Sequence, residues 1–335
     1  MNRLCGSAVF LTVVVSVSQG VAQVDRTSTR AAPAWAARPL RAGMIGTDTS
    51  HVPAFAEILR SHPEWKITFV AAFKGGSPDI PASANRVEGF ARTAHEKFGV
   101  ELVESIDALL AKVDVVLLTS VDGRSHLAQA APVLKAGKRV FIDKPLAASL
   151  EDVHRIVQLA RQTGTPFFSS SSTRFRPGVS RLSDNRDVGR VTKVQATYAL
   201  NRLEFHPDLF YYGIHGVEAL YAVMGTGCGA VSRRIERDAD ITTCTWQDGR
   251  IGIYHGTLKP APHMPLLHVW RERVTTDIAG AGNYEEMLRA IAEFFHTGRV
   301  PFDVAETIEM FEFMTAADLS KERNGAAVPL VEVRK

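Results

Sequence analysis

The chain has 335 residues, of which 45% are hydrophobic and 22% are charged, and this is the composition of a globular protein. The length favours two domains, because a single hydrophobic core stops growing at about 250–300 residues. The net charge of +3, with no long run of one sign, argues against a nucleic-acid partner.

The first residues have the pattern of an export signal. Arg3 precedes a largely apolar stretch from Leu4 to Val17, and small residues follow it. The stretch is too short and too interrupted for a permanent membrane span. We therefore expect a Sec-type signal peptide over residues 1–22, a tether over residues 23–40 and a periplasmic protein. Without a functional signal the protein would be cytoplasmic.

Strands and helices alternate over the next part of the chain, which is typical of a parallel sheet with crossover helices. We expect strands at residues 41–45, 67–73, 100–103, 113–119, 139–142 and 166–169, and helices at residues 52–60, 85–98, 105–112, 126–135 and 150–162. Ser50 is a candidate N-cap of the first helix. The pattern predicts an α/β domain of the Rossmann type, a doubly wound parallel sheet, over residues 41–172.

The remaining residues, 173–335, have a different pattern. Longer alternating strands are expected at residues 191–200, 239–247 and 250–258, and helices at residues 215–224, 284–297 and 305–322. Asp248-Gly249 between the last two strands is a strong hairpin signal. We expect an α+β domain with an open, mainly antiparallel sheet.

Cys228 and Cys244 have no metal-ligand or redox spacing. They could pair in an oxidising compartment, but two buried free thiols are the simpler interpretation.

The stretch GMIGTDTSH, residues 43–51, lies where the first strand should turn into a helix. In a dinucleotide-binding turn, G-x-G-x-x-G, the glycines permit the turn, the approach of pyrophosphate and the packing of helix on strand. Gly46 keeps the first role, but Asp48 and His51 stand in place of the other two glycines. A carboxylate disfavours pyrophosphate unless something neutralises it. The candidate cofactor-binding residues of this turn are Gly46, Thr47, Asp48, Thr49, Ser50 and His51.

At residues 141–147 the sequence FIDKPLA resembles the Glu-Lys-Pro signature of the Gfo/Idh/MocA family of sugar and polyol oxidoreductases. Further segments follow in the order of the family: VLLTSVDGRSH, TRFRP and GIHGVEALYAVMG. The resemblance covers nearly all of residues 41–335. It implies hydride transfer between a nicotinamide ring and a carbinol carbon of a sugar, cyclitol or related polyol.

The resemblance also implies roles for single residues. Lys144 would be the cation and proton-network partner at the reacting carbon, and His215 the acid/base, although a histidine that only fills a helix face is the alternative. Tyr211 stands where the family has an aspartate, and a tyrosine can donate a proton but carries no resident charge. The candidate substrate-binding residues are Arg174, His206, Asp208 and Tyr211. For Arg174, a surface ion pair is a competing interpretation.

The remaining candidate cofactor-binding residues are Lys74, Ser120, His126, Asp143 and Lys144. Lys74 follows the second strand, where no acid is present to hold a ribose 2′-hydroxyl. It could accept a 2′-phosphate, which would favour NADP over NAD, or be an ordinary exposed lysine. His126 could equally make only a local hydrogen bond. Asp48, His51, Asp122 and His126 have no metal-motif spacing, and we expect no metal.

Two functions therefore stay open. The first is an NAD(P)-dependent oxidoreductase acting on a carbohydrate-like substrate. The second is an exported relative that has lost the dinucleotide and acts as a carbohydrate-binding protein or as a lyase or hydrolase. The resemblance further implies a homo-oligomer, a dimer or tetramer, formed through the open sheet.

Overall fold

The structure is a computed structural model that describes residues 31–179, 182, 188–258 and 265–334. The predicted signal peptide and residues 23–30 of the predicted tether lie outside the described residues. Within the described ranges, no helix is both long and apolar enough to cross a membrane. Residues 32–335 form one compact unit that contains two β-sheets.

The first sheet has six parallel strands in the order β3-β2-β1-β4-β5-β6. They are β1 (Leu40–Ile45), β2 (Ile67–Phe73), β3 (Glu101–Val103), β4 (Val115–Leu118), β5 (Val140–Asp143) and β6 (Phe167–Ser170). The order reverses between β1 and β4, as in doubly wound nucleotide-binding folds, whose ligands lie at the carboxyl ends of the strands. Parallel strands are buried on both faces, which explains the nearly continuous apolar sequences of β2 and β4.

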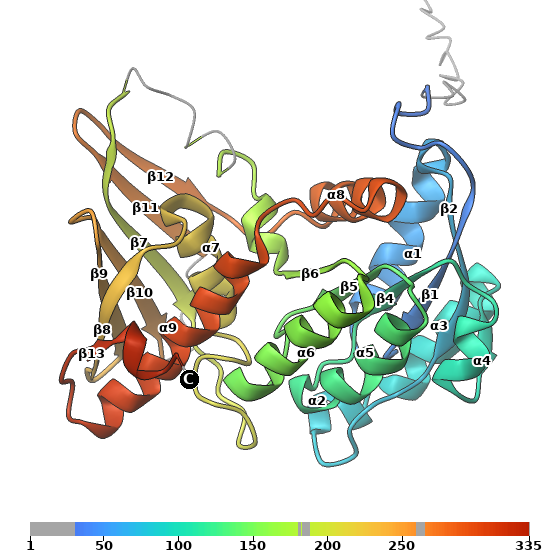
Figure 1. The fold of residues 1–335 in the computed structure, drawn as a ribbon, viewed down its shortest axis with the longest axis horizontal. Coiled ribbons are helices and arrows are strands. Elements are labelled where there is room, and N and C mark those ends of the chain that lie inside the picture. Colours follow the sequence, from blue (N-terminus) through green and yellow to red (C-terminus); the bar gives the residue numbers. More distant parts are fainter. Residues whose placement is uncertain (1–30, 180–181, 183–187, 259–264, 335) are drawn as a thin grey trace, which may run out of the picture. The chain divides into compact units, whose positions relative to one another are not determined.

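Helices cover both faces of this sheet (Figure 1). They are α1 (His51–Ser61), α2 (Pro81–Ala84), α3 (Val87–Phe98), α4 (Ile106–Leu110), α5 (His126–Lys135) and α6 (Leu150–Thr163). Side chains of α4, α5 and α6 share one core with β1, β4 and β5. Side chains of α1 and α3 pack in a second core on the other face, which α8 (Tyr284–Thr297) joins from the end of the chain. The predicted Rossmann-type sheet is confirmed.

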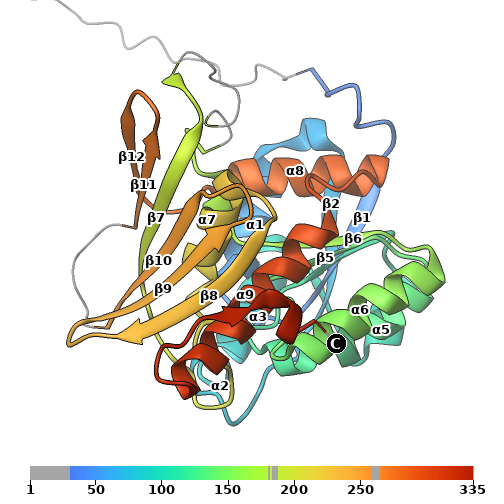
Figure 2. The same ribbon diagram turned by 60° about the vertical axis from the view of Figure 1, so that its left-hand side comes forward.

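The second sheet has seven strands in the order β12-β11-β7-β10-β9-β8-β13 (Figure 2). They are β7 (Val191–Ala199), β8 (Cys228–Ile235), β9 (Ala239–Trp246), β10 (Ile251–Thr257), β11 (Leu266–Arg271), β12 (Thr275–Ala279) and β13 (Val328–Pro329). All neighbours are antiparallel except β7 and β10. The predicted hairpin joins β9 and β10, and Gly249 has a φ of 84° there.

Two helices connect the second sheet with the rest of the unit. Helix α7 (Ile214–Met224) packs on β7 and β10, and α9 (Val304–Glu322) packs on both β8 and α6. Because α7 also packs on the segment that follows β6, its first turn lies close to the carboxyl edge of the parallel sheet. The mainly antiparallel sheet that the sequence predicts is therefore confirmed, and it carries one end of α7 to the candidate site.

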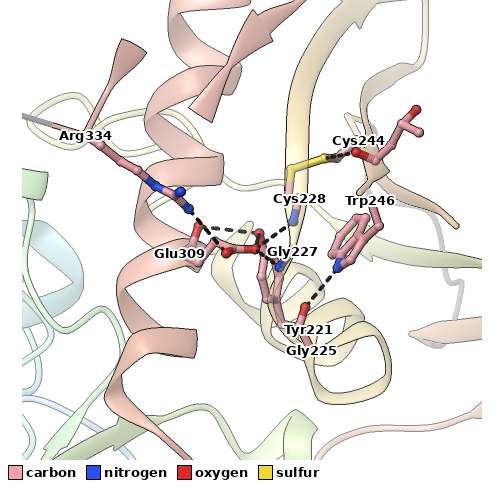
Figure 3. The surroundings of a disulfide bond; sticks show 9 residues. Tyr221, Gly225, Gly227, Cys228, Cys244, Trp246, Glu309 and Arg334 are labelled. Carbon is pink, nitrogen blue, oxygen red and sulfur yellow. Dashed lines mark hydrogen bonds and ion pairs between the residues drawn. A yellow bond between two sulfur atoms is a disulfide. The ribbon is translucent and has the colours of Figure 1, made fainter. Parts of the chain in front are cut away.

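Cys228 and Cys244 form a disulfide between the neighbouring strands β8 and β9, with their Cα atoms 6.0 Å apart. The prediction of two free thiols is wrong. Figure 3 shows the bond beside the buried side chain of Glu309, whose Oε1 accepts the backbone N–H groups of Gly227 and Cys228 at 2.7 and 2.9 Å. Disulfides persist in oxidising compartments and are rare in the cytosol.

We expect reduction of this disulfide to lower the free energy of unfolding by about 3 kcal/mol, because the denatured chain regains the entropy of an open loop. The bridged residues lie 16 positions apart in the sequence. Urea unfolding with and without a reductant measures the difference. The double variant Cys228→Ser/Cys244→Ser is the control. Its stability in both buffers should equal that of the reduced wild type. Equal stability of the oxidised wild type and this variant would contradict the prediction.

Candidate active site

Lys144 lies at the carboxyl edge of the parallel sheet. It follows Asp143, the last residue of β5, and its peptide bond to Pro145 is cis. Its Nζ atom lies 5.7 Å from the centre of the Tyr211 ring and has no hydrogen-bond or ion-pair partner among the described residues. Burial lowers the pKa of Lys144 below its ordinary value, against the charge of Asp143, and the charge of Arg86 adds to the lowering. An anion or a developing oxyanion at this place would therefore be stabilised by the lysine.

Helix α7 brings His215 to the same place. Its Nδ1 atom lies 2.7 Å from Oγ of Ser171, which follows β6, and the Tyr212 ring packs edge-on at 4.9 Å. Burial lowers the pKa of His215 well below its ordinary value, and the positive charge of Lys144 adds to the effect. At neutral pH this imidazole is therefore uncharged, and it can accept or donate one hydrogen bond.

Tyr211 completes the predicted trio of catalytic residues. Its ring lies near Lys144 on one side and 5.8 Å from the ring of His206 on the other. Burial raises the pKa of Tyr211 above its ordinary value, against the charge of Arg86. The phenol is therefore protonated at neutral pH and can donate a hydrogen bond to a ligand. The structure thus brings Lys144, His215 and Tyr211 together, with His206 at their side.

His51 joins the site from the start of α1. Its Nδ1 atom lies 2.7 Å from Oδ2 of Asp143, its Nε2 atom lies 3.0 Å from the hydroxyl of Tyr284, and its ring stacks on Phe55. Burial alone would raise the pKa of Asp143, but the close contact with His51 and the charge of Lys144 outweigh burial and hold that pKa below its ordinary value. Tyr284 is a site residue that the sequence analysis missed, because it lies 140 positions from Lys144 (284 − 144) in a helix with ordinary amphipathic spacing.

In the glycine turn the first glycine of the motif is present, and side chains occupy the positions of the second and third glycines. Gly46 has a φ of 92°, and a Cβ atom there would lie 2.3 Å from the backbone nitrogen of Ser120. Asp48 is fully buried and accepts hydrogen bonds from the Ser83 hydroxyl at 2.6 Å and from the Val121 N–H at 3.2 Å. Burial raises the pKa of Asp48, although these donors oppose the rise. The carboxylate of Asp48 thus accepts the hydrogen bonds of donors that lie next to the turn.

Residues 75–86, between β2 and α3, lie over this turn. The Ser77 hydroxyl donates to Asp122 at 2.6 Å, and the Ser77 N–H donates to the hydroxyl of Ser83, which bonds Asp48. The Thr47 hydroxyl donates to the first backbone carbonyl of α3 at 3.1 Å. Through these hydrogen bonds, residues 75–86 cover the glycine turn.

The start of α1 differs in detail from the prediction. Ser50 precedes the helix but has helical backbone angles and makes no side-chain capping bond. The hydroxyl of Thr49 instead accepts the N–H of His51 at 3.3 Å. Both Thr49 and Ser50 lie next to His51, but their side chains do not contact the lysine or the histidine of α7 in any bond that the structure describes.

Arg86 is a second residue that the sequence analysis missed. Its side chain donates to the backbone carbonyl of Ala82 and forms no ion pair among the described residues. Its positive charge lowers the pKa values of Asp48, Lys144 and Tyr211. The charge of Arg86 thus acts on both the glycine turn and the lysine, and it can attract an anionic group there.

Two of the predicted substrate-binding residues are engaged elsewhere. The guanidinium of Arg174 is buried between the carboxylates of Glu218 and Glu306. Asp208 accepts bonds from Lys321 at 2.6 Å and from the guanidinium of Arg233 at 2.8 Å. Both residues therefore hold elements of the second half of the chain together, and the structure does not bring either of them to Lys144.

Three predicted cofactor-binding residues make local contacts. His126 is fully buried, with Nε2 2.8 Å from the carbonyl oxygen of Ser120, which agrees with the alternative of a local hydrogen bond. The Ser120 hydroxyl itself donates to Gln129 at 2.8 Å. Lys74 forms an exposed ion pair with Glu88 at 3.0 Å, and exposed pairs of this kind are easily exchanged for another anion. Among the described residues, no group of three or more histidine, cysteine or acidic side chains gathers as a metal site.

The residues at the carboxyl edge of the parallel sheet fit one part of a nicotinamide dinucleotide. Lys144, Tyr211 and His215 surround the place where a reacting ring and substrate would meet. The Gly46 turn keeps the backbone of a phosphate-binding turn, but the Asp48 carboxylate accepts the neighbouring donors, the Ser83 hydroxyl and the Val121 N–H. Arg86 is the cation that can offset this carboxylate. A dinucleotide therefore fits if its phosphates are held mainly by the guanidinium instead of by backbone N–H groups.

Comparison with known proteins gives the same result for the part of the chain that forms the parallel sheet. Residues 40–170 match the family model described as "Oxidoreductase family, NAD-binding Rossmann fold". These residues match the NAD-binding Rossmann domain of the Gfo/Idh/MocA oxidoreductase family. This domain includes the glycine turn, Lys144 and β6, and the resemblance inferred from the FIDKPLA segment is confirmed.

Three similar proteins show how far along the chain the likeness extends. The dTDP-3,4-didehydro-2,6-dideoxy-alpha-D-glucose 3-reductase of Actinomadura kijaniata is 26% identical over 222 residues, which cover 61% of this chain and 63% of the reductase. GenD2 from gentamicin A biosynthesis, solved in complex with NAD, has a TM-score of 0.71 at 17% identity and covers 90% of this chain and 98% of its own. The myo-inositol 2-dehydrogenase of Lactobacillus plantarum has a TM-score of 0.72 at 15% identity, with 87% and 99% covered. The chain thus matches less than two thirds of the curated reductase, and the two solved structures share its fold.

Proposed function

We propose that this protein is an NAD(P)-dependent oxidoreductase that transfers a hydride to or from a carbinol carbon of a sugar, cyclitol or related polyol. The observation that carries the proposal is the convergence of Lys144, His215 and Tyr211 at the carboxyl edge of a Gfo/Idh/MocA Rossmann domain. The names of two relatives, a deoxysugar reductase and a myo-inositol dehydrogenase, support this class of substrate.

A bound nicotinamide dinucleotide would supply the hydride acceptor or donor. Arg86 would attract its phosphates, and Lys74 would meet a 2′-phosphate at the end of β2. Lys144 would stabilise the negative charge that develops on the substrate oxygen, because its own charge has no ionic partner among the described residues. His215 and Tyr211 would orient the substrate through hydrogen bonds.

Fluorescence titration with NADPH and NADH tests the proposal. We expect binding of both, with tighter binding of NADPH, because Lys74 can exchange its exposed bond to Glu88 for the 2′-phosphate. The variant Lys74→Ala should lose most of this preference while keeping its affinity for NADH. Lys97→Ala is the matched control, since Lys97 also forms an exposed ion pair, with Glu57. Lack of binding at millimolar cofactor would contradict the proposal.

A second function has two observations in its favour. The donors around the glycine turn are engaged by Asp48, and the disulfide is typical of compartments in which free nicotinamide cofactor is scarce. Both favour a protein exported to the periplasm by the signal over residues 1–22, acting without a dinucleotide as a carbohydrate-binding protein or as a lyase or hydrolase. The titration separates the two functions. For either function we propose a homo-oligomer, dimer or tetramer, formed through the open sheet.

A further inference from the structure

Beside Lys144, an aspartate, a histidine and a tyrosine contact one another in sequence, with the histidine in the middle. Asp143 comes from β5, His51 from α1 and Tyr284 from α8. The carboxylate lies 2.7 Å from one nitrogen of the imidazole, and the phenol lies 3.0 Å from the other. Three elements that are far apart in the sequence therefore converge on His51, which stands where the glycine motif would have its third glycine.

The carboxylate determines which way the hydrogen bonds run. The pKa of Asp143 is below its ordinary value, so the carboxylate is ionised at neutral pH and only accepts hydrogen bonds. We therefore assign an imidazole proton to Nδ1 of His51, which faces Oδ2 of Asp143 at 2.7 Å. The Nε2 atom is then an acceptor, and the hydroxyl of Tyr284 donates to it.

Packing holds the imidazole in this orientation. The ring stacks on Phe55 at 4.8 Å with an angle of 13° between the planes, and the Tyr284 ring meets it edge-on at 4.9 Å. His51 is only 8% exposed. A ring that is stacked and buried cannot turn to exchange its two nitrogens without moving its neighbours, so the order of donors and acceptors is fixed.

We propose that Tyr284 is the proton acceptor for the substrate hydroxyl and that His51 and Asp143 form the relay that receives its proton. The proposal rests on the proposed function, because it names the group that takes the proton lost when a carbinol is oxidised. In that step the substrate O–H bond breaks and its proton bonds to Oη of Tyr284. The phenol proton passes to Nε2 of His51, and the resulting imidazolium is stabilised by Asp143. The C–H electron pair leaves as hydride to the oxidised nicotinamide, and a carbonyl forms.

The other candidates for this role are less suitable. His215 has a pKa well below its ordinary value and lies near the positive charge of Lys144, which opposes its protonation. Lys144 is itself needed as the cation. Tyr211 has neither a histidine nor a carboxylate within hydrogen-bonding distance among the described residues. Of the site residues that the structure describes, Tyr284 alone is bonded to a base that an ionised carboxylate supports.

Charged and titratable groups on two elements face the relay of Asp143, His51 and Tyr284. Asp143 and Lys144 face it from the end of β5, and Tyr212 and His215 face it from the start of α7. Burial and the charge of Asp143 raise the pKa of Tyr284 above its ordinary value. The free phenolate is therefore disfavoured, and the phenol can act as a base only if its own proton leaves to His51 in the same step.

The first measurement is the ¹⁵N NMR spectrum of the histidine rings in the full chain. We expect His51 to be the Nδ1–H tautomer in the wild type and to lose this preference in Asp143→Asn. Tyr284→Phe should shift the Nε2 resonance alone. An Nε2–H tautomer in the wild type would overturn the proposal whatever the activity. This readout depends on neither cofactor nor substrate.

The second measurement is the oxidation of myo-inositol or D-glucose with NADP⁺ across pH. We expect Tyr284→Phe to reduce kcat by about 10²–10⁴-fold, the usual contribution of an acid–base group, and His51→Gln to reduce it similarly. NADPH affinity should stay within about twofold in Tyr284→Phe. His62→Gln is the matched control, because His62 also stacks on an aromatic ring, Trp65, and contacts a carboxylate, Glu64, at the far end of α1.

The outcomes separate this inference from the proposed function. Failure of the wild type to bind NADPH would contradict the proposed function, and the NMR result would then decide on the hydrogen-bond order by itself. Retention of NADPH binding together with an unchanged kcat in Tyr284→Phe would overturn the inference and leave the proposed function intact. A purely structural role for His51 would lower the unfolding temperature of His51→Gln without reducing kcat, and that result would also overturn it.

Discussion

Replacement of Lys144 by alanine is expected to reduce turnover by about 10³-fold while the protein stays folded. The lysine is the cation nearest the reacting centre, and removal of one such stabilising group from a buried site costs about 10²–10³ in kcat. Its pKa is lowered mainly by burial, which means that the folded protein gains little from holding its charge. The unfolding temperature of the variant should therefore be equal to or higher than that of the wild type.

The measurement pairs kcat for a polyol that the wild type oxidises with a thermal unfolding scan. Lys97→Ala, which breaks an exposed ion pair on α3, is the control and should change neither quantity much. Lys144→Met keeps the length of the side chain and should match the alanine variant in kcat. Turnover within about tenfold of the wild type in both variants would show that the lysine is not catalytic.

Replacement of Arg174 by alanine should instead act on stability, with an expected loss of about 3–5 kcal/mol in the free energy of unfolding. The guanidinium lies between Glu218 and Glu306 and stacks on the ring of Phe302, with its centre 3.9 Å away. The side chain of Glu218 is only 1% exposed. Removing the arginine leaves the carboxylates of Glu218 and Glu306 without their cation.

The loss should depend on pH in a defined direction. Burial raises the pKa of Glu306, against the pull of Arg174, and removal of the arginine raises it further. A carboxyl with a raised folded-state pKa stabilises the fold below its unfolded pKa and loses that stability as pH rises through the folded value. The deficit of Arg174→Ala should thus be smallest near pH 4 and largest at neutral pH. Urea unfolding at several pH values measures it, with Arg60→Ala, an exposed helix pair, as control. A large rise in KM without a loss of stability would instead support substrate binding by Arg174.

Much of the fold follows from the local pattern. Apolar runs such as those of β2 and β4, and amphipathic segments such as α5 and α8, were predicted to within a few residues, because a strand or helix buries one repeating set of side chains. Strands β8, β11, β12 and β13 were not predicted. β13 has only two residues, and β12 has a partly exposed sequence whose alternation is weak, so their pairing depends on neighbouring strands and not on their own pattern.

The candidate site likewise contains residues that the sequence predicts and residues that it does not predict. Lys144 and His215 could be predicted because short motifs surround them, and Tyr211 followed from its spacing to the histidine. Tyr284 and Arg86 could not, since each lies in a segment without a motif. For Arg174 the packing adds partners that the sequence does not reveal. Its motif suggested a substrate ligand, but its two buried glutamates come from α7 and α9, and only packing shows that they meet it.

By itself, the sequence determined the Rossmann-type domain, the lysine after β5 and the histidine on α7, because these depend on residue type and on spacing within one element. The tertiary structure alone decided the pairing of Cys228 with Cys244 and the closure of the glycine turn by Asp48 and Ser83. It also decided the place of His51 between a carboxylate and a phenol. Each of these is a contact between segments that are far apart in the chain. The energy of such a contact depends on burial and on the geometry of both partners, and neither can be read from one segment.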